Sequence, residues 1–250
     1  MRGNLPTPFW SSETIFSLKE MYEMSISTRG IIKCLRKKGK HQSRCSTYNN
    51  LHLCNNINFT QSGFAKVKAY NGDLDFNYHS VCKWKLSKEK DYAIHCFAED
   101  KDLEGKVWKN LELTTKRIKD SSLIIAPDFS MYIDPFLQTF NHYQVWKSRL
   151  VTAFWQSCGL PVVPLASWGS VDSLKYSLEG LPLHSILALS ATCCRRCKGA
   201  WNLWTYAVKT IVQELQPTML IIYGDPELKV PVDVPVKIIT DYIHQKLRKL

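Results

Sequence analysis

The chain has 250 residues, of which 45% are hydrophobic and 12% aromatic, and its formal net charge is +11. This length and composition are enough for one sizeable core, with or without an appendage, and they exclude an intrinsically disordered chain. No stretch reaches the roughly 18 apolar residues that a membrane span needs, so we expect no membrane partner.

The first element in chain order is a short amphipathic piece at residues 13–22, which predicts a helix. A basic segment follows at residues 25–58, which has weak periodicity and favours irregular structure. Residues 64–70 alternate apolar and polar side chains, with Lys66 and Lys68 among them, and this pattern predicts a strand with one cationic face.

Positive charge is concentrated in this N-terminal part. No Asp or Glu occurs between Glu23 and Asp73, and nine Lys or Arg residues lie there. Such a patch attracts polyanions, nucleic acid first and anionic lipid or an acidic protein second, and a solvated surface is the alternative. We therefore expect a nucleic-acid contact through Arg29, Lys33, Arg36, Lys37, Lys38, Lys40 and Arg44.

From residue 91 the pattern becomes regular, with short apolar runs alternating with amphipathic stretches. Strands are predicted at residues 92–97, 123–126, 162–166, 185–190, 219–223 and 234–239. Helices are predicted at residues 103–119, 134–158, 171–178, 201–216 and 241–250. The strongest helix start is Asp134 followed by Pro135, because Asp caps a helix and Pro suits its first turn.

This alternation predicts an α/β fold with a mostly parallel sheet covered by helices. Six strands are too few for a complete eight-stranded barrel, so we expect an open or incomplete barrel, with a full TIM-like barrel as the alternative. The expected domains are a basic, cysteine-containing region at residues 1–90 and an α/β core at residues 91–250. The N-terminus has no signal-peptide pattern, and nine cysteines are an odd number, which together favour reduced thiols in the cytoplasm.

Functional side chains of parallel sheets gather beyond the carboxyl ends of the strands. In this chain those positions carry the carboxylates Glu99, Asp100, Asp128, Asp172 and Asp225 and the polar or aromatic residues Ser130, Ser167, Trp168, Ser190, Thr192 and Tyr223. Converging carboxylates could hold Mg²⁺ and orient water at a phosphodiester, and we expect Asp128 with Asp100 to do so. Helix capping is the plainer role for any one of them.

Three further residue types have two readings each. Arg149, on a predicted helix, could bind an anion or pair structurally with Asp128. Trp168 could stack on a base or sugar, whereas the helical tryptophans are expected in the core. Cys194 and Cys197 form a single CxxC that could hold Zn²⁺ with Cys45 and Cys54, although one pair at this spacing is weak support and free thiols are the alternative.

Several short motifs carry a resemblance to a bacterial and phage family known as domain of unknown function 4417. They are residues 93–97, 127–130, 155–164, 167–169, 179–180 and 223–224, with Asn141, Tyr143 and Arg149. The resemblance spans residues 92–225 and implies a protein of phages, plasmids or integrative elements, acting in replication, transfer or phage defence. It implies no specific activity. Its motifs include Asp128, Ser130, Ser167 and Trp168, which the strand-end argument also selects.

We therefore expect a nucleic-acid-binding protein that processes nucleic acid, as a nuclease-like hydrolase of phosphodiesters, with Asp128, Ser130, Arg149, Ser167 and Trp168 in its catalytic site. The alternative is a non-catalytic module that binds nucleic acid or protein as a sensor, inhibitor or adaptor. A small-molecule enzyme is a third reading, and it would require a deep apolar pocket. Walker, GxGxxG, HExxH and GxSxG motifs are absent, which disfavours a P-loop NTPase and a nucleophile-elbow hydrolase.

Overall fold

The computed structural model describes residues 49–82, 91–192, 194 and 197–247, and the predicted helix at 13–22 and the basic cluster from Arg29 to Arg44 lie outside them. The chain divides into units at residues 1–51 and 52–250, and the fold below is that of the second unit. Residues 52–80, which the sequence groups with the N-terminal region, thus lie within the unit that contains the α/β core. No helix of the described residues is long and apolar enough to cross a membrane.

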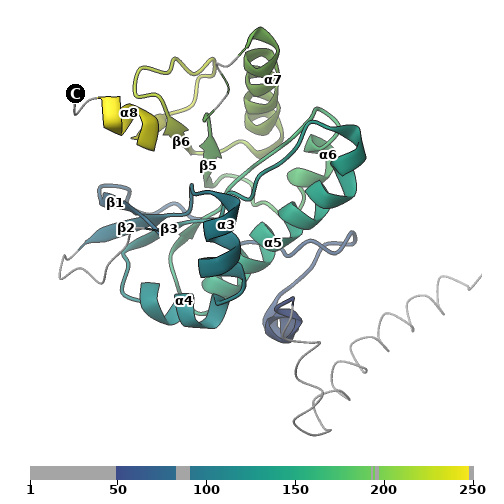
Figure 1. Ribbon diagram of the computed structural model, residues 1–250, viewed down its shortest axis with the longest axis vertical. Helices are drawn as coiled ribbons and strands as arrows, with labels where there is room; N and C mark the ends of the chain where they lie inside the picture. The colour runs from purple at the N-terminus through teal and green to yellow at the C-terminus, as the bar shows by residue number, and fades with distance from the viewer. Residues whose placement is uncertain (1–48, 83–90, 193, 195–196, 248–250) are drawn as a thin grey trace, which may run out of the picture. The chain divides into compact units, whose positions relative to one another are not determined.

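The strands are β1 (Asn77–Ser80), β2 (Tyr92–His95), β3 (Leu123–Ile125), β4 (Val162–Val163), β5 (Ile186–Ser190), β6 (Met219–Gly224) and β7 (Val236–Thr240). The helical elements are η1 (Leu51–Asn56), α3 (Asp100–Asp102), η2 (Leu103–Trp108), α4 (Leu111–Ile118), η3 (Pro135–Leu137), α5 (Gln138–Ser157), α6 (Leu174–Ser177), α7 (Lys198–Leu215) and α8 (Tyr242–Leu247). Strands and helices alternate along the chain, as the sequence pattern predicts (Figure 1).

All paired strands are parallel. They form one sheet in the order β1-β2-β3-β4 and a second in the order β5-β6-β7. A parallel bridge between Leu165, just after β4, and Ala188 in β5 joins the two sheets. The predicted mostly parallel α/β fold is therefore confirmed.

The seven described strands form an open, barrel-like arrangement and not a closed barrel. Within the described residues, no backbone hydrogen bonds pair β1 with β7. The two edges meet instead through Lys237, whose ammonium donates to the Leu74 carbonyl. Its Nζ also lies 5.4 Å from the centre of the Tyr78 ring. Ile94 of β2, Ile125 of β3 and Ile221 of β6 belong to one core cluster that draws on both sheets. The prediction of an open or incomplete barrel is thus confirmed, and the alternative of a full barrel is wrong.

Helices cover the outer faces of these strands. Trp204, Val208 and Ile211 of α7 pack on the apolar side chains of β5 and β6, which Figure 1 shows beside that helix. Leu150, Val151 and Trp155 of α5 pack within the first cluster. Strand side chains point alternately inward and outward, so each strand contributes to both layers of packing.

Two of the predicted elements take a different form in the structure. The helix predicted at residues 103–119 is broken into a π-helical turn and α4, with Lys109 and Asn110 between them. The strand predicted at residues 64–70 forms only an isolated bridge from Ala65 to Phe59, although Lys66 and Lys68 are exposed as expected. The predicted helix start at Asp134 is confirmed, because its Oδ1 accepts the Phe136 N–H at 2.9 Å.

Candidate functional site at the carboxyl ends of the strands

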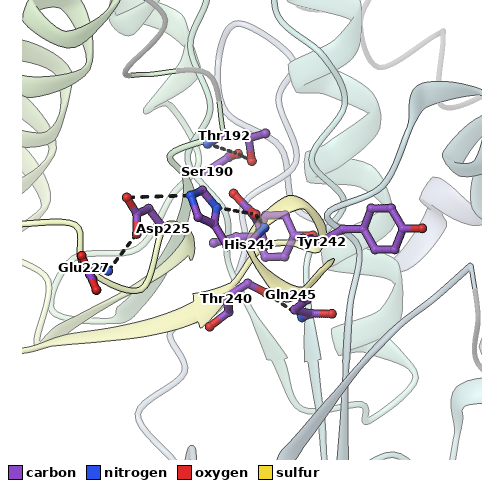
Figure 2. A network of polar contacts seen from close by, with 10 residues as sticks. Ser190, Thr192, Asp225, Glu227, Thr240, Tyr242, His244 and Gln245 are labelled. Carbon is purple, nitrogen blue, oxygen red and sulfur yellow. Dashed lines mark hydrogen bonds and ion pairs between the residues drawn. The ribbon is translucent and has the colours of Figure 1, made fainter. Parts of the chain in front are cut away.

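Because every strand pair is parallel, the carboxyl ends of neighbouring strands meet at one edge of each sheet. Polar side chains follow six of the strands there: Asp100 after β2, Asp128 and Ser130 after β3, Ser167 after β4, Ser190 and Thr192 at the end of β5, Asp225 after β6, and Asp241 and His244 after β7. We call this set the strand-end rim. Figure 2 shows Ser190, Thr192, Asp225 and His244 of this rim from close by.

Asp128 is a half-buried carboxyl of the rim whose pKa is strongly shifted. Burial and the nearby charge of Asp100 raise the pKa of Asp128 to about 7, and a side-chain hydrogen bond with Ser190 acts in the opposite direction. A buried carboxylate is costly in a medium of low polarity, so the neutral acid is favoured. Asp128 therefore exchanges its proton close to neutral pH. Its contact with Ser190 also brings the ends of β3 and β5 together across the two sheets.

Asp100 is fixed by polar contacts with the segment that follows Asp128. Its Oδ1 accepts the Ser130 N–H at 2.9 Å, and its Oδ2 accepts from Gln144 Nε2 at 3.4 Å. Gln144 Nε2 also donates to the Ser130 carbonyl at 3.2 Å. Asp100, Ser130 and Gln144 thus form a connected group beside Asp128. The sequence argument selects Asp100 and Ser130 and misses Gln144, whose position in the middle of a helix carries no local signal.

Ser190 is held by the strand end and by its neighbours. Its Oγ lies 3.1 Å from the Thr192 Oγ1, and its carbonyl accepts the indole N–H of Trp204 at 3.0 Å. Beneath the rim, His95 and Phe97 face Tyr223, with the Phe97 and Tyr223 rings stacked 4.6 Å apart. Burial lowers the pKa of His95 to about 4, so this imidazole is neutral at pH 7. The floor of the site is therefore aromatic and uncharged.

His244 and two carboxylates form a polar group after β6 and β7. His244 Nδ1 lies 2.8 Å from Oδ1 of the buried Asp241, and its Nε2 lies 3.9 Å from Asp225 Oδ2 (Figure 2). The sequence places Asp225 at a strand end but assigns residues 241–250 to a basic terminal helix, and so misses Asp241 and His244. Asp241 directly follows a predicted strand, so the same strand-end rule could have selected it.

Ser167 and Trp168 follow β4 and are half-buried, and Trp168 packs against the cluster formed by α7 and β5. They lie at the same edge as Asp128, since β3 and β4 are parallel neighbours. Arg149 does not join them. Its guanidinium is buried and donates to the carbonyls of Leu165, Ser177 and Glu179, and not to Asp128. Arg149 thus does not form the predicted pair with Asp128, and it links α5 to a residue just after β4 and to the end of α6.

The predicted metal ligands have other contacts. Cys197 Sγ accepts the Ala200 N–H at 3.4 Å and caps α7, and Cys194 is buried in the α7 cluster. Within the described residues, no group of three or more His, Cys, Asp or Glu side chains is placed to share a metal ion. The Zn²⁺ site, which draws on Cys45 outside the described part, and Mg²⁺ at Asp128 and Asp100 stay predictions.

Gly169 makes the closest backbone approach near the rim. A Cβ added there would lie 2.2 Å from the carbonyl oxygen of Tyr132, in the segment that leads from Asp128 to α5. We expect Gly169→Ala to lower the free energy of unfolding by about 1–3 kcal/mol, because two backbone segments must separate. Urea unfolding measures this loss. Gly105→Ala is the control, since its Cβ would meet no atom within 4 Å; equal stabilities of the two variants would contradict the prediction.

The chain matches one family model and is similar to phage proteins. The family model described as a domain of unknown function, DUF4417, matches residues 68–243. The Gene 1 protein of Mycobacterium phage L5 is 29% identical over an alignment of 156 residues, and the match covers 60% of this chain and 67% of the phage protein. The Gene 1 protein of Mycobacterium phage D29 is 27% identical over 151 residues, and the match covers 58% of this chain and 55% of that protein. No solved structure matches.

The family match extends beyond the motifs that suggest it in the sequence, and it includes β1 to β7 and the whole strand-end rim apart from His244. The phage proteins are similar to this chain at moderate identity, and the chain belongs to the DUF4417 family.

Proposed function

We propose that this chain processes nucleic acid for a mobile genetic element, by cleaving phosphodiesters at the strand-end rim. The observation that carries the proposal is Asp128, a half-buried carboxyl facing Asp100 and Ser190 at the rim of an open barrel. Strongly perturbed carboxyls at such an edge are typical of catalytic acids and bases. The acid-free, nine-cation segment supports nucleic acid as the substrate, and the phage relatives support a mobile-element setting.

In this reaction Asp128 donates a proton to the leaving oxygen. A carboxyl that stays protonated near neutral pH is a good proton donor and a poor metal ligand, since metal binding needs the carboxylate. Asp100, whose oxygens already accept two hydrogen bonds, holds the neighbouring charge that favours the neutral acid. Cleavage assays with and without Mg²⁺ test the alternative in which Asp128 and Asp100 bind the metal.

Binding to labelled single-stranded RNA and DNA tests the substrate class. We expect the logarithm of the binding constant to fall steeply and linearly with the logarithm of the salt concentration. The reason is that each phosphate neutralised by the protein releases counterions on binding. Replacing the exposed Lys66 and Lys68 by Gln should reduce the slope on single strands by about 0.7 for each phosphate that is no longer neutralised. Lys209→Gln, exposed on α7, is the control. An affinity that does not change with salt would contradict nucleic-acid binding.

A non-catalytic binding module is the second candidate, because one surface favours it. The segment from β3 to α5 exposes large apolar side chains: Phe136 is 93% exposed and Ile133 67%. Exposed apolar patches of this kind mark contacts with other molecules. Cleavage of RNA or DNA by the wild-type protein would support the nuclease. Tight binding to either nucleic acid, with no cleavage whether or not Mg²⁺ is present, would support the non-catalytic module.

A small-molecule enzyme has less support. Two hollows formed by the described residues are open to solvent. The one of about 510 Å³ lies between β1 and β7 and is lined by residues such as Tyr78 and Lys237. Neither is lined by Asp128 or Ser190. These two hollows therefore do not supply the deep apolar pocket at the rim that a small-molecule enzyme requires.

A further inference from the structure

The Asp241–His244 pair has the geometry of an oriented base. Asp241 is 3% exposed, and its Oδ1 lies 2.8 Å from His244 Nδ1. A carboxylate oxygen only accepts, so this contact assigns the proton of the neutral imidazole to Nδ1 and leaves the Nε2 lone pair free to accept. The half-buried imidazole therefore presents an acceptor nitrogen toward the rim, where Asp225 Oδ2 lies 3.9 Å away.

Helix capping explains only part of this arrangement. Asp241 Oδ1 also accepts the His244 backbone N–H at 2.9 Å, which is an ordinary cap of the short helix α8. Capping needs an acceptor at Asp241 but places no demand on the side chain three residues later. The second contact, from the same oxygen to the imidazole, fixes the ring as well as the helix. A buried carboxylate that orients an imidazole through Nδ1 is the arrangement of known catalytic pairs.

The pair lies at the same edge as Asp128. Ser190 pairs in register with Tyr223, and Gly224 pairs with Thr240, so the ends of β5, β6 and β7 are direct neighbours. The Asp241 N–H donates to the Gly224 carbonyl at 3.0 Å, and the Tyr242 N–H donates to the Tyr223 hydroxyl at 3.0 Å. These bonds anchor the start of α8 to the rim. Ser190 then links this side of the rim to Asp128.

We propose that His244, held by Asp241, is the general base that activates the attacking water at the strand-end rim, opposite Asp128 as the acid; this role rests on the proposed function. His244 Nε2 takes one proton from water, and the water oxygen forms the new bond to phosphorus. The bond from phosphorus to the leaving oxygen breaks, and that oxygen takes the proton of Asp128. The protein is left with His244 as an imidazolium and Asp128 as a carboxylate, and proton exchange with solvent restores both side chains.

The charged groups that the structure places against His244 are Asp241 and Asp225. Asp241 is a positioning residue, since it acts through the imidazole. Asp225 lies within range to stabilise the imidazolium once it forms, and its own side chain is fixed by accepting the Glu227 N–H at 2.9 Å. Negative charge thus lies at both nitrogens of the imidazolium that the reaction forms.

Two substrates separate the roles of base and acid. On RNA or DNA we expect His244→Gln and Asp128→Asn each to lower kcat by about 10²–10⁴-fold. Thymidine 5′-(p-nitrophenyl phosphate) has a leaving group that needs no proton. On this ester Asp128→Asn should regain most of its rate, whereas His244→Gln should stay slow. His52→Gln is the matched control, since His52 also lies beside a carboxylate, Glu112, but away from the rim.

The outcomes distinguish this role from the proposed function. A wild-type protein that cleaves no substrate would overturn both, whereas a His244→Gln variant that cleaves as fast as wild type would overturn only the base. Asp241→Asn should lower kcat without changing KM, because it disturbs orientation and not binding. Nitrogen NMR of the imidazole gives a readout independent of activity: a His244 ring protonated at Nε2 and bare at Nδ1 in the neutral form would also overturn the proposal.

Discussion

Replacing Asp128 by Asn should slow nucleic-acid cleavage by about 10²–10⁴-fold while leaving nucleic-acid binding intact. Asn keeps the size of the side chain and can still hydrogen-bond to Ser190, but it has no carboxyl proton to donate. Gel assays of cleavage and anisotropy assays of binding, on the same oligonucleotides, measure the two effects separately. Asp172→Asn is the control, because Asp172 is exposed and pairs only with the exposed Lys175 among the contacts of the described residues. A variant as fast as wild type would remove Asp128 from the mechanism.

The same substitution should change how stability depends on pH. The pKa of Asp128 rises from 3.8 in the unfolded chain to about 7 in the native protein. Between these values the native protein holds a proton that the unfolded chain has released, so the free energy of unfolding falls as pH rises from about 4 to 7. A shift of this size corresponds to a loss on the order of 4 kcal/mol above pH 7.

Asp128→Asn removes this loss, because an amide does not ionise. We expect the variant to gain stability relative to wild type as pH rises, with little difference at pH 4 and the full difference at pH 8. Urea unfolding at several pH values measures the effect, and Asp172→Asn should follow the wild-type curve. Parallel curves for wild type and Asp128→Asn would show that the carboxyl is not destabilised in the native protein.

Arg149→Ala should be the most destabilising of the substitutions considered. The guanidinium is 2% exposed, and burial lowers its pKa to about 9. Its removal leaves the carbonyls of Leu165, Ser177 and Glu179 without this donor and opens a cavity against α5. Buried groups left unpaired cost about 1–3 kcal/mol each, so we expect a total loss of about 3–5 kcal/mol.

Thermal unfolding measures this loss, because 1 kcal/mol shifts the Tm of a chain of this size by about 2–4 °C. A drop on the order of 10 °C is therefore expected. The Tm of Arg149→Lys should lie between those of Arg149→Ala and the wild-type protein, since one ammonium cannot reach all three carbonyls. Arg117→Ala, at an exposed site on α4, is the control. If Arg149→Ala and Arg117→Ala unfold at the same temperature, the carbonyl contacts contribute nothing.

Short apolar runs predict most of the fold, because buried parallel strands must be apolar on both faces. Strands at residues 123–125, 186–190 and 219–224 lie within or next to the predicted ranges. β1 is missed because its residues, Asn77 to Ser80, are polar and partly exposed, and only pairing with β2 makes them a strand. The break at Lys109 is missed because the periodic apolar pattern continues through it into α4.

The site is predictable as far as it depends on topology. Parallel strands bring their carboxyl ends to one edge, so Asp100, Asp128, Ser190 and Asp225 can be selected without coordinates. The partners of Arg149 cannot, because backbone carbonyls of distant loops leave no signal in side-chain identity. The pairing of His244 with Asp241 depends on where the last strand ends. The basic cluster from Arg29 to Arg44 lies outside the described residues and stays a prediction.

The open side of the barrel leaves the two halves of the rim in different sheets. Asp128 belongs to the four-stranded sheet, whereas Asp225 and His244 belong to the three-stranded one. Backbone hydrogen bonds next to β4 and β5 join the sheets on one side, and on the other the Lys237 side chain reaches Leu74. Because backbone hydrogen bonds of the described residues join the sheets on one side only, we expect the distance between the Asp128 carboxyl and the His244 imidazole to vary more than the continuous hydrogen bonding of a closed barrel would allow.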